Sequence, residues 1–404
     1  MAHIPKLRFK GFTEEWEQRK VGEITSVLSG SRVHKDDWTA NGVPFYRSSD
    51  VVSAYKGTQN VKAFISHELF ESLAATSGKL EKGDILITGG GSIGIPYIVP
   101  DSKPLYTKDA DLIWVKKSTN HDSKYLYTYF ESKSFREYLN SISHTGTISH
   151  YTIEQVKATP VSMPILEEQK KIGELFTAMD HLITLHRHKC DSLKQVKKYM
   201  LQKMFPKQGE KVPEIRFAGF TGEWEQRRFG DVGSVSMCKR IFKDETTDEG
   251  DIPFFKIGTF GGEPDAYISR LLFEDYKAKY PYPNKGDILL SASGTIGRMV
   301  EYNGEEAYFQ DSNIVWLSHD QSIDNTYLKV LYEIVRWDGI EGSTIQRLYN
   351  DNFLKTKFLM PNKYEQKKIG AYFAGIDSLI ALHQRKVDSL KEIKKFMLQN
   401  MFPK

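Results

Sequence analysis

The sequence predicts an α+β protein with an internal pseudo-two-fold repeat, in which two long antiparallel coiled-coil helices hold two globular domains apart. The first supporting observation is that residues 5–24 and 213–232 open two halves of the chain, with 12 of 20 positions identical. The second is that residues 164–207 and 361–404 close these halves, with 27 of 44 positions identical. The stretches between them, 25–160 and 233–357, differ. A repeat of this length is a domain and not a solenoid unit.

Each closing segment carries the apolar spacing of a coiled-coil helix. Steps of mostly three or four residues join two equivalent series: Ile172, Leu175, Met179, Leu182, Leu193, Val196 and Met200, and Ile369, Tyr372, Ile376, Leu379, Leu390, Ile393 and Met397. Pro164 and Pro361 precede the two segments. A helix of about 40 residues extends roughly 60 Å. Two like helices that pack antiparallel would relate the two halves of the chain by a two-fold axis.

His186 and His383 interrupt the two series at equivalent positions. We treat a register-setting polar contact between them as a hypothesis. Four other apolar residues lie beside the series, namely Phe176, Ile183, Phe373 and Ile380. They either dock partner proteins or widen the seam within the molecule.

We call the repeated opening and closing segments the shared frames. The segments between them have the sequence pattern of mixed helix and strand. Runs rich in β-formers occur at residues 84–88, 97–99, 111–115, 287–290 and 313–317. Helical runs follow at 124–140 and 326–337. We therefore expect each domain to be built on a curved, mostly antiparallel sheet. The predicted boundaries are 1–160 and 208–357 for the domains, and 161–207 and 358–404 for the helical segments.

The composition excludes several classes of protein. The 404 residues are 40% hydrophobic and 27% charged, as in an ordinary globular protein. The chain contains no run of about 18 apolar residues, so we expect no membrane span. Cys190 and Cys238 lack CxxC spacing, which fits the reducing cytoplasm and argues against a zinc site. The net charge of +4 is only mildly basic and does not by itself indicate a nucleic-acid-binding protein.

Residues 89–94, GGGSIG, match the G-x-G-x-x-G pattern of dinucleotide sites. We reject that interpretation because IPYIV follows, which reads as a strand and not as a helix that could hold pyrophosphate. The second half carries SASGTIG at residues 291–297. Both segments predict a strand, a glycine turn and a second strand. The turn is either a plain hairpin or a loop whose backbone approaches a ligand such as DNA.

No catalytic constellation is recognisable. The chain lacks a P-loop, HExxH, a G-x-S-x-G elbow and the Asn/Asp-Pro-Pro-aromatic tetrapeptide of amino-methyltransferases. We therefore expect no enzyme activity and no cofactor or metal bound by this chain itself.

Polar and aromatic side chains within the divergent segments are candidates for hydrogen bonds to base edges, because Arg, Lys and Gln match the major-groove pattern of guanine and adenine. With the turn glycines, the set in the first half is Tyr46, Arg47, Ser48, Ser49, Lys56, Gly90, Gly91, Ser92, Lys108, His144, Thr147, His150 and Tyr151. In the second half it is Lys256, Thr259, Ser291, Ser293, Thr295, Arg298, Gln310, Ser312, Gln346, Arg347 and Tyr349.

The closing segments resemble the conserved helical regions of type I restriction–modification specificity (S) subunits. They read EQKKIGELFTAMDHLITLHRHKCDSLKQVKKYMLQKMFPK (168–207) and EQKKIGAYFAGIDSLIALHQRKVDSLKEIKKFMLQNMFPK (365–404). The opening PKLRF-GF-EW-Q frames, the KGDIL…G-IG turns and the duplicated layout are also similar, so the resemblance covers the whole chain. The variable segments match only as target recognition domains, and no base can be read from them.

This resemblance implies a cytoplasmic, non-catalytic subunit that reads double-stranded DNA. Each target recognition domain (1–160 and 208–357) would read one half of a split target, and the spacer helices would fix the distance between the halves. Two methyltransferase (M) subunits would modify adenine with S-adenosylmethionine. Two restriction (R) subunits would add translocation and cleavage with ATP and Mg²⁺. These cofactors would belong to the partners.

The layout also has geometric consequences. Because the domains differ in sequence, we expect an asymmetric and interrupted target, with half-site centres about 10 base pairs apart. Two alternatives remain open. A self-contained modification enzyme would transfer methyl groups unaided, and a coiled-coil scaffold would bind only proteins and no particular DNA sequence.

Overall fold

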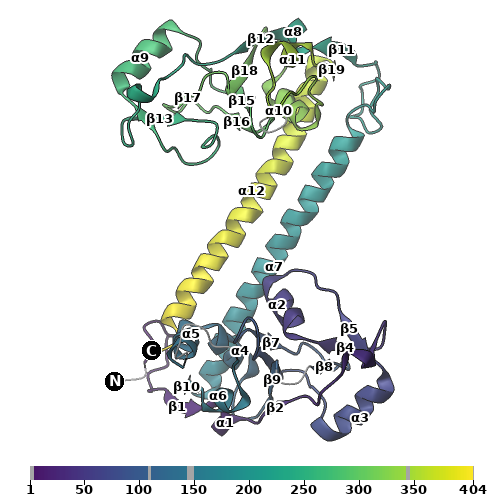
Figure 1. Ribbon diagram of the computed structural model, residues 1–404, viewed down its shortest axis with the longest axis vertical. Coiled ribbons are helices and arrows are strands. Elements are labelled where there is room, and N and C mark those ends of the chain that lie inside the picture. The colour runs from purple at the N-terminus through teal and green to yellow at the C-terminus, as the bar shows by residue number, and fades with distance from the viewer. Residues whose placement is uncertain (1–3, 108–110, 143–149, 343–345, 404) are drawn as a thin grey trace. The chain divides into compact units, whose positions relative to one another are not determined.

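The computed structural model describes residues 4–107, 111–142, 150–342 and 346–403 (Figure 1). The chain divides into two compact units. Unit 1 comprises Met1–Arg187 together with Gln384–Lys404, and unit 2 comprises His188–His383. Among the described residues, no helix is long and apolar enough to cross a membrane.

Unit 1 mixes short strands with short helices. Its strands are β1 (Glu17–Lys20), β2 (Val27–Ser29), β3 (Trp38–Thr39), β4 (Val43–Tyr46), β5 (Ala63–Ile65), β6 (Ile85–Thr88), β7 (Pro96–Ile98), β8 (Tyr106–Thr107), β9 (Leu112–Val115) and β10 (Pro160–Met163). Its helices are α1 (Val21–Ile24), η1 (Lys35–Asp37), α2 (Ser48–Lys56), α3 (His67–Ser77), α4 (Ser123–Glu131), α5 (Lys133–Ser141) and α6 (Ile153–Ala158). Helix α7 (Leu166–Lys203) begins in this unit.

The described residues of unit 1 form three small sheets. Their strand orders are β2-β9-β6-β7, β3-β5-β4-β8 and β1-β10. All pairs are antiparallel except β4–β8, which is parallel. The prediction of mostly antiparallel pairing is therefore confirmed, whereas that of one curved sheet is wrong. Strands of two to four residues supply too little edge to extend one continuous sheet.

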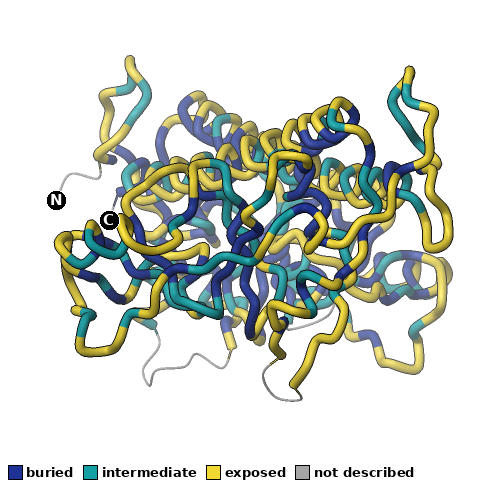
Figure 2. Tube along the Cα trace, turned by 90° about the horizontal axis from the view of Figure 1, so that it is seen from above, coloured by how far each residue is buried: buried dark blue, intermediate teal, exposed yellow. Residues whose placement is uncertain are grey.

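The central sheet of unit 1 is buried on both faces, which explains why its strands read as unbroken apolar runs. Ile85 and Ile113 face a core formed with α4, α5 and α7. Leu86 and Trp114, one residue further along each strand, face a second core beneath α2. Figure 2 shows buried stretches of the trace in the interior and exposed loops at the rim.

Unit 2 repeats this plan. Its strands are β11 (Glu225–Arg228), β12 (Gly233–Ser236), β13 (Ile252–Phe255), β14 (Tyr267–Ile268), β15 (Ile288–Ser291), β16 (Met299–Glu301), β17 (Tyr308–Phe309), β18 (Ile314–His319) and β19 (Lys357–Met360). Its helices are α8 (Phe229–Val232), η2 (Lys243–Glu245), α9 (Arg270–Lys279), α10 (Asn325–Ile334) and α11 (Asn350–Lys355), and α12 (Lys363–Asn400) begins in it. The strand orders β12-β18-β15-β16 and β11-β19 match those of unit 1. The order β14-β13-β17 corresponds to β5-β4-β8 without a counterpart of β3, and β13–β17 is its parallel pair.

The shared frames anchor each long helix at its start. Arg8 donates two hydrogen bonds of 2.8 Å to the buried carboxylate of Glu168, in the first turn of α7. Arg216 and Glu365 form the same bidentate pair in unit 2. A buried carboxylate needs such a partner, and near a helix N-terminus the helix dipole also favours its charge. These contacts account for the arginine of the opening frame and the glutamate of the closing frame.

The repeated MFPK ends complete the cores. Phe402, at the end of the chain, lies within the unit 1 core, and its ring is 6.3 Å from that of Trp16. Phe205 occupies the same place in unit 2, 5.6 Å from Trp224. The unit 1 core therefore contains the last residues of the chain, and the backbone N–H of Leu7 donates to the carbonyl of Asn400.

Each unit by itself shows that its two helical segments pack antiparallel. In unit 1, Phe402 contacts Phe176, and eight residues earlier Lys394 reaches Asp180, four residues further along α7. The contacts Phe205–Phe373 and Lys197–Asp377 repeat this pattern in unit 2. The helices span 38 residues each, close to the predicted 40. The predicted antiparallel helix pair is confirmed. A contact between His186 and His383 stays a prediction.

The second row of the seam lies one residue further along each helix than predicted. Leu182 and Val196 are 41% and 45% exposed, and Leu379 and Ile393 are both 46% exposed. The row is instead formed by Phe176, Ile183, Cys190, Lys197 and Met204, and by Phe373, Ile380, Val387, Lys394 and Met401. Residues at i+3 and i+4 both lie on the same side of a helix, so an apolar pattern alone did not separate them.

The four residues with two possible roles therefore belong to the interior. Phe176, Ile183 and Phe373 are buried, and Ile380 packs against the unit 2 core. They widen the seam, and the interpretation that they dock partners is wrong. The helix predicted at 124–140 is also interrupted, because Ser132 ends α4 and caps α5 through a bond from Phe135 N–H.

Candidate nucleic-acid interface

The glycine turn of unit 1 joins β6 to β7 as an antiparallel hairpin. The Thr88 hydroxyl donates to the carbonyl of Ser92 and accepts from the N–H of Ile95, which closes the turn. Gly94 has a φ of 71°, and a Cβ there would lie 2.5 Å from Leu139. Only glycine fits such a backbone without strain. The predicted strand–turn–strand is confirmed.

Two other segments are fixed against this turn. Gly89 donates its N–H to the carbonyl of Asp111, the residue before β9, over 2.8 Å. The N–H of Tyr151 donates to the carbonyl of Gly89 over 2.7 Å, and Gly90 forms a β-bridge with His150. We call residues 89–92, Asp111 and His150 the unit 1 platform. Its backbone is held by the hairpin itself, by Asp111 and by the segment at residues 150–151.

Unit 2 builds the same arrangement around the β15–β16 turn. Ala292 donates to the carbonyl of Asn313 and accepts from Leu348, while Gly294 N–H donates to Gln346. Arg347 bridges to both Ser293 and Glu341 through its backbone. We call residues 292–295, Asn313 and Arg347 the unit 2 platform. Because these are backbone bonds, the architecture does not depend on the side chains that it presents.

The side chains of the two platforms differ at most corresponding positions, and Gly91 and Gly294 are a glycine that both share. In unit 2 the Ser293 hydroxyl donates to Asn313 Oδ1 at 2.7 Å, and Arg347 Nη2 approaches the same oxygen at 3.4 Å. The corresponding residues of unit 1 are Gly90, Asp111 and His150, by their matching backbone bonds. One platform presents a cation and a serine–amide pair, and the other presents a carboxylate and an imidazole.

A cavity of 590 Å³ adjoins the unit 2 platform. It is lined by Met237, Ser312, Glu341, Arg347, Leu348, Tyr349, Asn350, Asp351, Asn352 and Lys355. Ser312 has a φ of 52°, rare for a residue other than glycine, so this corner of the site is locally strained. Arg347 and Tyr349 are exposed at the cavity. Three predicted candidates thus gather here with several polar residues that sequence reasoning missed.

Several candidates of unit 2 use their side chains internally. Ser291 and Ser293 are buried, and Gln310 accepts from the N–H of Ile257 through its side-chain oxygen. Thr259 bonds the backbone of Lys256, whose own ammonium pairs with Asp265. Arg298 donates to the carbonyl of Phe260. Thr295 and Gln346 are exposed.

The candidates of unit 1 divide in the same way. Arg47 pairs with Asp50 and lies over the ring of Trp38, while Ser48 donates to the carbonyl of Asp111. Tyr46 packs against Tyr97, and Tyr151 is buried with its hydroxyl against Thr159. Burial raises the pKa of the Tyr151 hydroxyl. The exposed candidates are Ser49, Lys56, Gly91, Ser92 and His150. Lys108, His144 and Thr147 lie outside the described residues.

Asp111 and Asn313 are the polar residues that sequence reasoning left out of the site. They were recognised only as the first residues of the runs DLIWV and NIVWL. The signal that identifies them is a polar side chain at the same end of two equivalent buried strands.

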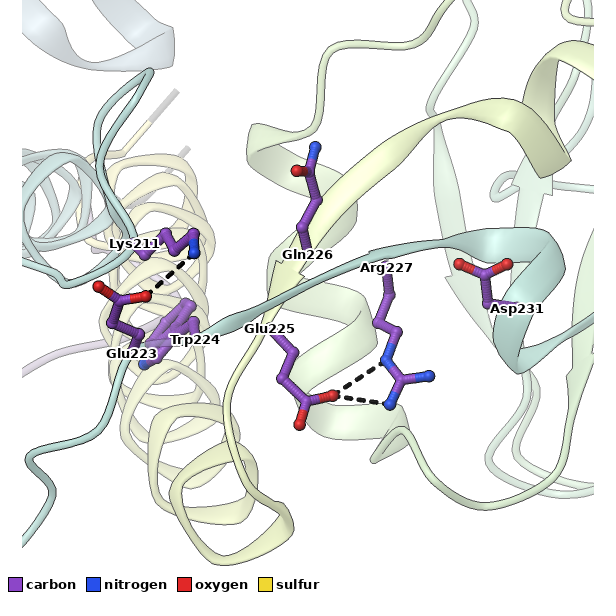
Figure 3. A pocket seen from close by; sticks show the side chains of 7 residues that line it. All are labelled: Lys211, Glu223, Trp224, Glu225, Gln226, Arg227 and Asp231. Atoms are coloured by element: carbon purple, nitrogen blue, oxygen red, sulfur yellow. Dashed lines mark hydrogen bonds and ion pairs between the residues drawn. The ribbon is translucent and has the colours of Figure 1, made fainter.

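A further cavity of 770 Å³ lies along β11 in unit 2 (Figure 3). Four of its charged residues pair with one another, Lys211 with Glu223 and Arg227 with Glu225, as the dashed lines show. These residues belong mostly to the shared opening frame, in which 12 of 20 positions are identical in the two halves. We therefore place the candidate interface at the platforms and not at this larger cavity. Among the described residues, no His, Cys, Asp and Glu cluster suits a metal ion.

Comparison with known proteins decides the family. A family model described as the type I restriction modification DNA specificity domain matches residues 13–195 and, a second time, residues 221–392. The chain belongs to this family. A Haemophilus influenzae protein assigned as a type I restriction enzyme specificity subunit is 34% identical over 365 residues, covering 89% of this chain and 86% of that protein. The MjaIX specificity subunit of Methanocaldococcus jannaschii is 22% identical, over 96% of this chain and 93% of its own length.

Solved structures support the fold. The type I restriction–modification S subunit from M. genitalium aligns with a TM-score of 0.64 at 15% identity, over 99% of both chains. A chain from a structure on assembly and conformational transition of the type I R-M system aligns with a TM-score of 0.52 at 16% identity, over 95% of this chain and 96% of that one. The predicted family and α+β fold with two repeated domains are confirmed.

Proposed function

We propose that this chain reads an asymmetric DNA target in two separated parts, one with each unit, and that it is not itself catalytic. The observation that carries the proposal is the contrast between the two platforms. Their backbones are fixed by matching hydrogen bonds, while their side chains differ at most corresponding positions. A conserved scaffold with altered contacts is what two different half-sites require, because base-edge contacts specify sequence and the scaffold fixes their register.

The catalytic steps would belong to partners. We propose that two M subunits methylate adenine N6 with S-adenosylmethionine, and that two R subunits add ATP- and Mg²⁺-dependent translocation and cleavage. The complex would act on DNA in the cytoplasm. The long helices would set the distance between the two half-sites.

The exposed apolar rows of the helices offer docking sites for the M subunits. In unit 1 the rows comprise Leu182 and Leu185 on α7 with Ile393 and Phe396 on α12. In unit 2 the equivalent residues are Val196, Tyr199, Leu379 and Leu382. Large apolar side chains at helical spacing on a surface are suited to a partner helix. Two equivalent patches support two copies of one partner.

The test is a domain exchange read at base resolution. The chain is produced with an M subunit, and methylated adenines are mapped in cells that carry or lack it. Residues 25–160 are then replaced by the corresponding segment of another family member, and in a matched variant residues 233–357 are replaced. We expect each exchange to alter one half of the methylated motif and leave the other half intact.

Three outcomes would contradict the proposal. A change in both halves from one exchange would mean that the units do not read separately. Methyl transfer by the purified chain alone would indicate a self-contained enzyme. Absence of any selective DNA binding with the M subunit would indicate a scaffold that binds only proteins.

A further inference from the structure

Arg347 combines an exposed side chain with a tightly held backbone. Its N–H donates to the Glu341 carbonyl over 2.8 Å, and its own carbonyl accepts from Glu341 N–H over 3.1 Å. The neighbouring residue, Leu348, is buried and donates to Ala292. An arginine whose backbone is already held in this way loses little further backbone freedom on binding. This favours a defined contact over a diffuse electrostatic one.

The side-chain oxygen of Asn313 lies beside the guanidinium of Arg347. This Oδ1 atom accepts from the Ser293 hydroxyl at 2.7 Å and lies 3.4 Å from Arg347 Nη2. The Ser293 bond fixes the direction of that oxygen, since the serine is itself buried. The guanidinium keeps its other N–H donors for a ligand, because this is the only side-chain bond that Arg347 makes within the described part of the chain.

The surroundings favour a base edge over a phosphate. Glu341 and Asp351 line the same cavity as Arg347 and Lys355, so the cavity is not uniformly cationic. Carboxylates beside an arginine weaken attraction to phosphate, whereas a planar guanidinium can still donate two parallel bonds to the O6 and N7 atoms of guanine.

We infer that Arg347 reads a guanine in the half-site of unit 2, that Asn313 positions it, and that Asp111 and His150 occupy the corresponding places in unit 1. This inference rests on the proposed function and names the base for that unit. Asp111 and His150 present no guanidinium, so the unit 1 half-site lacks this guanine contact.

The first test compares variants of the full chain produced with its M subunit, by base-resolution methylation mapping. Arg347→Ala should relax one guanine position in one half-site, with roughly a tenfold to hundredfold loss of discrimination there. Asn313→Ala should give a smaller loss at the same base pair. Asn313→Asp should restore the preference, because it keeps the oxygen that faces Arg347. Arg228→Ala, at an exposed arginine of β11, should leave the motif unchanged.

Several results would overturn the inference. One is an unaltered motif in Arg347→Ala, and another is a relaxed position in both half-sites. Uniform weakening at every position, with a shallower salt dependence, would indicate a phosphate contact. If wild-type chain directs no motif at all, the proposed function fails and not the role of Arg347. Thermal melting of each variant checks that it is folded.

A graft provides an independent test. A Cβ at Gly90 would lie 2.8 Å from Asp111 Oδ1, so the side chain at position 111 must shift slightly to admit a serine at position 90. The triple variant Gly90→Ser, Asp111→Asn and His150→Arg recreates the unit 2 set, in which serine donates to the amide oxygen. We expect it to add a guanine requirement to the unit 1 half-site. A folded triple variant with an unchanged motif would count against the inference, and an unfolded one leaves the decision to Arg347→Ala.

Discussion

At position 121, unit 1 buries a histidine where unit 2 buries Ile323. Both ring nitrogens of His121 lack hydrogen-bond partners within the described part of the chain, and the residue is 4% exposed. Burial lowers the pKa of the imidazole, against a smaller opposing effect of Asp122. The folded state therefore resists protonation that the unfolded chain accepts.

This predicts a pH-dependent stability that one substitution removes. Above the unfolded pKa of about 6.5 the ring is neutral in both states. As pH falls below that value the unfolded state gains protons first, so the free energy of unfolding decreases until the lower folded-state pKa is passed. His121→Ile should abolish this loss and, by removing unsatisfied polar atoms, raise stability by about 1 kcal/mol at neutral pH. Urea denaturation between pH 5 and 8 measures both effects. A pH profile identical to that of the wild type would contradict the assignment to His121.

At the scale of elements, a buried ion cluster joins the two long helices to each unit. In unit 1, Lys394 of α12 bonds Asp180 of α7 at 2.7 Å and Glu131 of α4 at 2.8 Å. Burial raises the pKa of Glu131, and Lys394 opposes that shift. Burial alone lowers the pKa of Lys394, but the two carboxylates outweigh it and raise the pKa overall, so the lysine stays charged.

The same cluster in unit 2 is more open. Lys197 bonds Glu333 and Asp377, each at 2.7 Å. The side chain of Glu333 is 23% exposed, whereas that of Glu131 is 5% exposed. Water therefore compensates Glu333 when its cation is removed, but compensates Glu131 poorly.

The pair of clusters offers a matched comparison of one substitution in two settings. Lys394→Met should cost about 3 kcal/mol in the free energy of unfolding, because it leaves Glu131 buried without a cation. Lys197→Met should cost only about 1 kcal/mol, because water screens its partners. Denaturant unfolding at pH 7.5 measures both. Adding Glu131→Leu to Lys394→Met should recover most of the loss, since an apolar pair satisfies a buried site. Equal costs at the two lysines would contradict the role of burial.

At the scale of the whole molecule, the duplicated apolar patches predict the number of partners bound. Phe396→Glu in unit 1 and Tyr199→Glu in unit 2 each place a charge in one exposed patch. Each single variant should bind one M subunit where the wild type binds two, and the double variant should bind none, because docking would bury an unpaired carboxylate. Analytical ultracentrifugation of the mixture reads the stoichiometry.

The control is Thr184→Glu, which adds the same charge to an exposed helix position in unit 1. At about 100° per residue, Thr184 lies roughly 160° around α7 from Leu182 and roughly 100° from Leu185, so it is off their row. It should leave two partners bound. Loss of both partners from either single variant would mean that the patches do not act separately.

The sequence by itself determined the repeat, the long helices and the central strands. Strict repetition of the frames, together with heptad spacing, needs no knowledge of contacts to indicate two like domains and their helices. The glycine turns could also be predicted from the sequence, because G-[ST]-I-G between two β-rich runs leaves few conformations other than a tight hairpin. The buried strands could be recognised in the sequence as unbroken apolar runs, because both faces of the central sheet are covered.

Only the tertiary structure decided which helix row is buried, how many sheets form and which polar residues meet. Val196 suits a seam better than Lys197 by polarity, but Glu333 and Asp377 satisfy the lysine and reverse the choice. Asn313 and Arg347 are 34 residues apart and meet through a backbone ladder that no local pattern encodes. Periodicity reports which side of an element is apolar. The partner of a polar group depends on segments distant in sequence, which come together only in the folded chain.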